Sequence, residues 1–385
     1  MASIHANDAG LVHDVLERYP ELRPKLNDTM PGLHFGATPL LAAVPFTNRD
    51  MIDALLQAGA DINQKSHWWA GGFGVLDDDR GMASFLIERG ARVDVHAAAK
   101  LGMMDVLERL VQDDEGVVHA RGGDGQTPLH VAQTVAVAEW LLNHGADIDA
   151  RDVDHESTPA QYMIRDRQAV ARFLISRGCS SDILMAAALG NLALVRTHLE
   201  ADPGCIRMFV ADEWFPKRDP RAGGCIYIWT LGQLATPHSV AREFGHEEVF
   251  QFLMDRTPEE LRLALACDLG DDATFRQLLA ARPHLAESLS GEDKKHLVRA
   301  AQSKTRTRCG SCSQPDGRSW CAGSTAARRC TGPPGTATRR WCARSCATTR
   351  RSTCAATTTT SRLSAGRCTG RSTAGTARQA TTLES

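Results

Sequence analysis

The sequence contains cysteine, histidine, aspartate and glycine residues of the kinds found in active sites and metal sites, but few of them have the spacing that such sites require. Cys179 follows a glycine at the expected end of a helix, where a thiol can become reactive, although a small buried residue is the favoured interpretation. The glycine-rich stretches 71–74 and 122–125 match neither the phosphate-loop nor the dinucleotide-binding spacing, and a turn is favoured at the second, which precedes Thr127. His246-Glu-Glu lacks the second histidine of a metalloprotease helix, and Asp77–Asp79 lacks the alternating ligands of a calcium loop.

Four cysteines near the C-terminal end have spacings that suit zinc. Cys309 is followed by Cys312, and Cys342 by Cys346; ligand spacings of this size occur in tetrahedral zinc sites. The same stretch contains no histidine and lacks the apolar residues that surround zinc in small modules. We therefore expect no metal and no cofactor.

Aromatic side chains gather in two irregular segments and suggest a contact surface. Trp68 and Trp69 lie in one segment, and Trp214, Tyr227 and Trp229 lie in the other. Exposed tryptophans and tyrosines are common energetic anchors of protein interfaces. The alternative, that these rings patch the core where the chain is irregular, stays open.

The second aromatic segment also offers the one alternative that involves catalysis or a small ligand. Asp212 and Glu213 lie in it, and His238 follows shortly after. If these three groups met in a pocket with perturbed pKa values, the segment 207–234 would be an active site or a ligand site.

The elements that position these residues repeat along the chain. In the clearest unit, Thr127 can cap a helix, Pro128 fits its first turn, and Gly145 can end a second helix. Similar units start at Thr38, Thr158 and Thr236. The helix-ending glycines Gly59 and Gly90 are 31 residues apart, and Gly145 and Gly178 are 33 apart. Each unit therefore reads as a helix, a tight turn, a second helix and a projecting loop.

This pattern resembles the ankyrin-repeat family. The period near 33, Thr-Pro-Leu-His at 127–130 and Leu-Leu-x-x-Gly-Ala-Asp-Ile-Asn/Asp at 55–63 and 141–149 carry the resemblance, which covers roughly residues 5–304. Leu41 and Gln161 depart from the family's histidine, and residues 207–234 interrupt the period.

The resemblance implies an all-α solenoid of about nine helix-turn-helix units over residues 1–304. It also implies a protein–protein interaction module without catalysis, and a structural role for His130. The projecting loops and first helices would form the contact face, including Trp68, Trp69, Trp214, Tyr227 and Trp229 and the loop aspartates Asp61 and Asp147.

Charge divides the chain into two parts. Residues 1–300 contain 29 basic and 44 acidic residues, a net of −15, which favours basic partners and repels nucleic acid. Residues 301–385 contain 14 Arg and one Lys against Asp316 and Glu384, a net of +13. No stretch is apolar enough to span a membrane or to act as a secretory signal. The scattered cysteines of the first part suit a reducing cytoplasm, and we expect a monomer.

Residues 305–385 have the composition of a disordered, basic tail. They contain no Val, Ile, Met, Phe, Tyr or His and cannot build a core. Arg329-Cys-Thr-Gly recurs as Arg367-Cys-Thr-Gly, and a reading shifted by one nucleotide permits Ala-Leu-His-Trp, which resembles the start of an ankyrin repeat. We hypothesise that the reading frame slips near residues 301–306 and that two further repeats are lost. A natural basic tail is the alternative, and a damaged product without function is the third interpretation of the chain.

Overall fold

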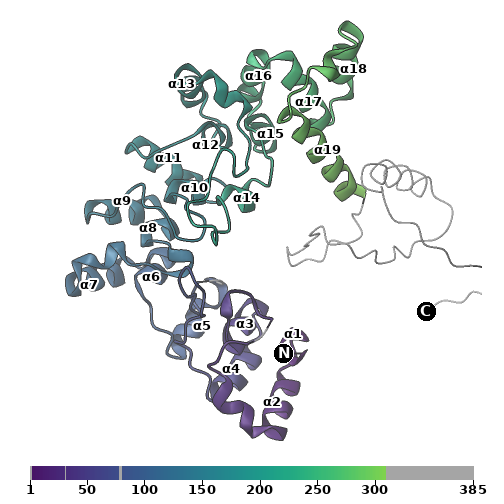
Figure 1. Ribbon diagram of the computed structural model, residues 1–385. Coiled ribbons are helices and arrows are strands. Elements are labelled where there is room, and N and C mark those ends of the chain that lie inside the picture. The colour runs from purple at the N-terminus through teal and green to yellow at the C-terminus, as the bar shows by residue number, and fades with distance from the viewer. Residues whose placement is uncertain (1, 31, 78–79, 309–385) are drawn as a thin grey trace, which may run out of the picture. The chain divides into compact units, whose positions relative to one another are not determined.

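The computed structural model describes residues 2–30, 32–77 and 80–308, and this part of the chain is helical without strands (Figure 1). The helical part continues beyond residue 304, because the last helix, α19, runs through Arg308. Residues 309–385 lie outside the described residues. The expected disorder of the tail, the frame slip and the cysteine spacings that suit zinc therefore stay predictions. None of the described helices is both long and apolar enough to cross a membrane.

Eight helix pairs follow one another in the described part. They are α1 (Ala2–His5) and α2 (Ala9–Arg18), α3 (Pro39–Ala43) and α4 (Arg49–Gln57), α6 (Val95–Leu101) and α7 (Met104–Asp113), α8 (Pro128–Val131) and α9 (Val135–Asn143), α10 (Pro159–Met163) and α11 (Gln168–Ser176), α12 (Ile183–Ala188) and α13 (Leu192–Ala201), α15 (Pro237–Glu243) and α16 (Glu247–Arg256), and α17 (Glu259–Leu269) and α18 (Asp272–Ala281).

Three further helices are α5 (Ala83–Glu88), α14 (Tyr227–Thr230) and α19 (Asp293–Arg308). The 3₁₀ turns are η1 (Pro20–Lys25), η2 (His34–Gly36), η3 (Val44–Phe46), η4 (Arg80–Met82), η5 (Glu115–His119), η6 (Gly123–Gly125), η7 (Pro203–Arg207) and η8 (Leu285–Glu287). The unit that ends in α5 has only η4 where a first helix is expected. With this unit, the eight pairs match the expected number of about nine.

A threonine starts several first helices, and the residue three positions later completes the cap. The backbone N–H of Thr127 donates to His130 Nδ1 at 3.0 Å. One unit later the corresponding amide donates to Gln161 Oε1 at 2.9 Å, and in the α15 unit it donates to Ser239 Oγ at 2.9 Å. Gln161 therefore replaces the family's histidine in this cap, whereas the apolar side chain of Leu41 has no acceptor to offer.

Glycines end several second helices in the left-handed conformation, as the sequence predicts. Gly145 has φ +88°, and the next amide, of Ala146, donates back to Leu141 O at 3.0 Å. Gly59, Gly90 and Gly178 have φ between +90° and +106° with the equivalent bond. These bonds satisfy helix-end carbonyls and turn the chain toward the next loop.

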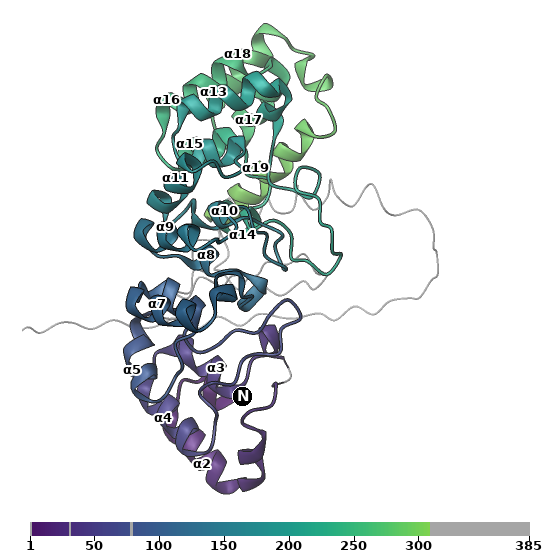
Figure 2. The same cartoon turned by 90° about the vertical axis from the view of Figure 1, so that its left-hand side faces the viewer.

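The core lies between successive pairs, which lie side by side in both views (Figures 1 and 2). Most first helices bury more than half of their residues, and α12 buries all of them. Second helices bury one stripe, such as Val137, Ala138 and Leu141 of α9. Alanine-rich first helices let neighbouring units approach closely, so each unit covers the apolar face of the one before it.

The expected interruption of the period is a long insertion between α13 and α15. Its two ends are joined by hydrogen bonds between backbone groups, from Val210 N to Ala235 O (3.0 Å) and from Leu234 N to Val210 O (2.9 Å). The short helix α14 lies near its end and packs against α10. The insertion thus leaves the stack at one point and folds back toward earlier units.

Candidate interaction surface on the loops

The first pair of predicted contact residues lies in the loop after α4. Trp68 packs edge-on against Phe35, with ring centroids 5.0 Å apart, and its ring centroid is 6.1 Å from that of Trp69. Both tryptophans are partly exposed. Both rings pack within an irregular unit and remain partly accessible, so their contact with a partner stays a prediction.

The predicted residues of the insertion divide into inward-facing and outward-facing rings. Trp229 is 59% exposed, whereas Tyr227 is fully buried and donates its hydroxyl to Asp182 Oδ2 at 2.9 Å. Two positions along a helix are about 200° apart, so α14 points these side chains in opposite directions. The prediction of Tyr227 as a contact residue is therefore wrong. Trp214 is partly exposed and stands edge-on to the buried Phe209, which gives it a packing role.

The predicted loop aspartates are exposed and shape their own turns. Asp61 Oδ1 accepts the N–H of Asn63 at 2.8 Å, and Asp147 Oδ1 accepts that of Asp149 at 3.0 Å. These are Asx turns, in which the side chain bonds the backbone two residues ahead. Local structure is therefore a sufficient reason for both aspartates, and their contact with a partner stays a prediction.

A ladder that the sequence analysis missed joins successive loops. Asn27 Oδ1 accepts the N–H of Asp61 at 2.7 Å, and Asn63 Oδ1 accepts that of Arg92 at 2.8 Å. Asp149 makes the same bond in a later unit. The recurrent Asp-Ile-Asn/Asp motif could have predicted this ladder. Its last residue, Asn63 in one unit and Asp149 in another, supplies the hydrogen-bond acceptor.

The catalytic alternative required Asp212, Glu213 and His238 to meet, and each has a different partner instead. Glu213 is paired with Lys295, whose hydrogen bond lowers the pKa of that carboxyl. His238 is fully buried with its Nε2 2.7 Å from Thr257 Oγ1, and burial lowers its pKa to about 3. The exposed Asp212 lies 3.8 Å from Lys217. The structure therefore does not bring these three groups together.

Cys179 is not an activated thiol. Burial raises its pKa to about 12, so the thiol stays protonated near neutral pH. The favoured interpretation, a small buried residue, is confirmed by its position in the core.

The insertion folds back over the loop that precedes α10. Gly223 N donates to Asp154 O at 2.8 Å, and the amides of Arg218 and Asp219 donate to the Glu156 carboxylate at 2.7–3.0 Å. On the other side, the Arg221 guanidinium lies 4.3 Å above the Trp69 ring. Residues 66–74, 151–157 and 218–230, called the loop surface below, are therefore held together.

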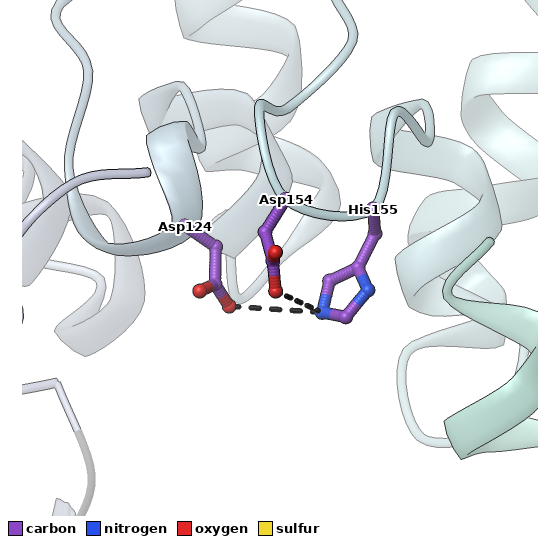
Figure 3. A group of neighbouring side chains, drawn as sticks. All are labelled: Asp124, Asp154 and His155. Carbon is purple, nitrogen blue, oxygen red and sulfur yellow. Dashed lines mark ion pairs between the residues drawn. The ribbon is translucent and has the colours of Figure 1, made fainter. Parts of the chain in front are cut away.

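Beneath this loop surface lies a cluster that the sequence analysis did not single out. His155 Nε2 is 3.8 Å from Asp124 Oδ2 and 3.6 Å from Asp154 Oδ2 (Figure 3). Asp124 is buried and has φ +55°, and burial raises its pKa to about 6. The sequence signal was the run of Asp152, Asp154 and His155 one repeat period after Asp124.

The His130 side chain has the structural role that the resemblance implied. Its Nδ1 accepts the Thr127 amide, so Nε2 carries the proton and donates to Ser157 O at 3.0 Å. The imidazole thereby caps its own helix and bonds to the next unit. Burial lowers its pKa to about 3.

Comparisons with known proteins agree with this architecture. The family model described as "Ankyrin repeat" matches residues 35–67, and that described as "Ankyrin repeats (3 copies)" matches residues 95–185. The mouse protein named Ankyrin repeat and SAM domain-containing protein 6 is 27% identical over 120 residues, which cover 30% of this chain and 13% of that protein. Ankyrin repeats are generally protein–protein interaction modules and are typically not enzymes. On its repeats, its helix caps and these matches, the chain contains ankyrin repeats.

Proposed function

We propose that this chain binds another protein through the loop surface, with Trp229 as the central contact. The observation that carries the proposal is the 59% exposure of Trp229 on a short helix that Tyr227 anchors in the core. Ile226 N donates to Ser157 Oγ at 3.0 Å, and Tyr227 is bonded to Asp182, so α14 has fixed positions on both earlier loops and core. An exposed tryptophan on a fixed helix loses little conformational entropy on binding.

The overall charge of the first part of the chain supports a partner with a basic segment. Residues 1–300 as a whole have a net charge of −15. Such a surface attracts positively charged partners at long range and repels nucleic acid.

The loop surface supports binding better than catalysis, because the three groups considered for an active site each have a different partner. The exposed aromatic rings, by contrast, lie on segments held in place by backbone bonds. Monomeric state and cytoplasmic location stay predictions.

Affinity capture with the full chain tests the proposal. The wild-type chain, Trp229→Ala and Tyr19→Ala would be immobilised, and retained proteins would be quantified by mass spectrometry. Tyr19 is a matched control because it is 46% exposed and lies at the end of α2, outside the loop surface.

The expected result is a set of proteins retained by wild type and Tyr19→Ala but reduced at least tenfold with Trp229→Ala, since truncating a hot-spot tryptophan costs about 2 kcal/mol or more. Equal retention by all three chains would show that Trp229 is not the contact. Retention of nothing above background by wild type would favour the interpretation of a product without function.

A further inference from the structure

The cluster of Asp124, Asp154 and His155 has the donor set of a cation site. One imidazole nitrogen and two carboxylate oxygens, from two successive loops, lie within 4.8 Å of one another. Figure 3 shows the His155 ring with Nε2 toward both carboxylates. Ligand atoms that share one ion at about 2.1 Å are about 3.0–3.5 Å apart, so the observed 3.6 and 3.8 Å require only small side-chain rotations.

The second ring nitrogen of His155 determines what Nε2 can do. Nδ1 lies 2.9 Å from Gly224 O, a carbonyl that can only accept, so Nδ1 carries a proton. In the neutral imidazole, Nε2 then carries no proton, and its lone pair faces the two carboxylates. An N–H bond from the same histidine to a backbone carbonyl is the usual way in which proteins orient a metal-ligating imidazole.

A direct hydrogen bond from His155 Nε2 to either carboxylate does not account for this geometry. An imidazolium N–H bound to a carboxylate is expected at about 2.7–2.9 Å. Both Nε2–oxygen distances exceed that range by more than 0.5 Å, which is beyond hydrogen-bond contact. The separation suits an ion between the three atoms better than a shared proton.

Asp124 supplies an independent observation. The residue is about nine-tenths buried, its Oδ1 has no hydrogen-bond partner, and its Oδ2 is directed at His155 (Figure 3). A buried carboxylate without partners is costly unless a cation or hydrogen bonds compensate its charge. The Trp68 Nε1 group interacts with Asp124 and lowers the pKa of that carboxyl, but it lacks the geometry of a full hydrogen bond, so the indole compensates the buried charge only in part.

We propose that Asp124, Asp154 and His155 bind one divalent transition-metal ion, through one oxygen of each aspartate and Nε2 of the histidine. The mixed oxygen and nitrogen donors suit ions such as Mn²⁺ or Zn²⁺. Three protein ligands leave positions for water or for a group of a partner.

The insertion provides the second layer of this site. Gly223 N donates to Asp154 Oδ1 at 3.2 Å, which leaves Oδ2 for the ion, and Gly224 O orients His155. A Cβ on Gly223 would lie 3.2 Å from Asp154 Oδ2, a tight contact that would push on this carboxylate. The ion would therefore join the loops of two repeats beneath the insertion and hold the segment that leads to Trp229.

Manganese binding to the full chain tests the proposal. Mn²⁺ prefers oxygen and imidazole donors, so the cysteines after residue 300 compete little for it. Free Mn²⁺ would be measured by electron paramagnetic resonance during titration of wild type, Asp124→Asn, His155→Ala and the control Asp147→Asn. Asp147 is exposed and shapes only its own turn, so its variant keeps the proposed site.

We expect one Mn²⁺ per chain for wild type and Asp147→Asn, and at least a tenfold larger Kd for Asp124→Asn and His155→Ala. Far-UV circular dichroism checks that the variants fold, and asparagine suits the left-handed backbone at position 124. Added Mn²⁺ should raise the thermal midpoint of wild type and not of Asp124→Asn. Absence of binding by wild type at millimolar Mn²⁺, or equal binding by all four chains, would overturn the proposal.

Discussion

Replacing His130 by glutamine or by leucine separates its two hydrogen bonds. Glutamine already caps the next unit at position 161, so His130→Gln should keep an acceptor for the Thr127 amide and lose the bond to Ser157 O. That carbonyl still accepts the Asp152 amide at 3.1 Å, so the loss should be about 0.5–1.5 kcal/mol. His130→Leu also leaves the buried Thr127 amide unpaired, which adds about 1–3 kcal/mol.

The contribution of His130 to the free energy of unfolding should also fall as the pH is lowered. The pKa of His130 is about 3 in the folded chain and about 6.5 in the unfolded chain. Between these two pH values, His130 is therefore protonated in the unfolded chain and neutral in the folded chain. This contribution to stability is complete above pH 6.5 and is lost progressively as pH falls toward 3. For this residue alone, the linkage relation gives a loss of about 2 kcal/mol at pH 5 in the wild type and none in His130→Gln. The buried His238 and His296, whose pKa values are also lowered, contribute equally to both chains.

Urea unfolding followed by circular dichroism at pH 7 and pH 5 measures both effects. At pH 7 the expected order of stability is wild type, His130→Gln, His130→Leu. At pH 5 His130→Gln should be as stable as wild type or more so. The same gap between wild type and His130→Gln at both pH values, or equal stability of the two variants, would refute the assigned bonds.

Three further results are expected. Tyr227→Phe removes the hydroxyl bond to the half-buried Asp182 and should lower the free energy of unfolding by about 1–2 kcal/mol, whereas the exposed Trp229→Phe should change it little. Equal urea midpoints for Tyr227→Phe and wild type would contradict the buried position of Tyr227. Cys179, Cys205 and Cys225, whose pKa values burial raises to about 12, 11 and 11, should resist iodoacetamide at pH 7.5 in the folded chain, as mass spectrometry would show; rapid labelling of Cys179 would disprove its burial. If the frame slips near residues 301–306, resequencing codons 295–310 should reveal it, and restoring the frame should improve solubility because Leu297 and Val298 are 37% and 52% exposed on α19; an intact natural frame would end that hypothesis.

The regular parts of this fold could be predicted because each signal is local. A threonine at a helix start and a glycine at a helix end each act within about five residues, and both appear as the sequence predicts at Thr127 and Gly145. The repeat period then places equivalent loops beside one another. The same rule would have paired Asp124 with Asp154, one period apart, although the sequence analysis did not use it.

The insertion could not be predicted in the same way, because it has no period to fix its direction. Whether Tyr227 or Trp229 faces the core depends on where α14 begins and how it meets α10. The hydrogen bond from His155 to Gly224 joins residues 69 positions apart in the chain, so no local sequence pattern predicts it. Contacts of this kind, in which the insertion packs back on the loops of earlier units, build the loop surface.

The central claim is that a protein partner contacts the loop surface, and amide hydrogen exchange tests it most directly. Exchange of the full chain would be compared with and without a partner obtained by capture. The account predicts slower exchange on binding in residues 66–74 and 226–231, around Trp229 and Trp69. Protection confined to the second helices α7, α9 and α11, with those loop segments unchanged, would contradict it.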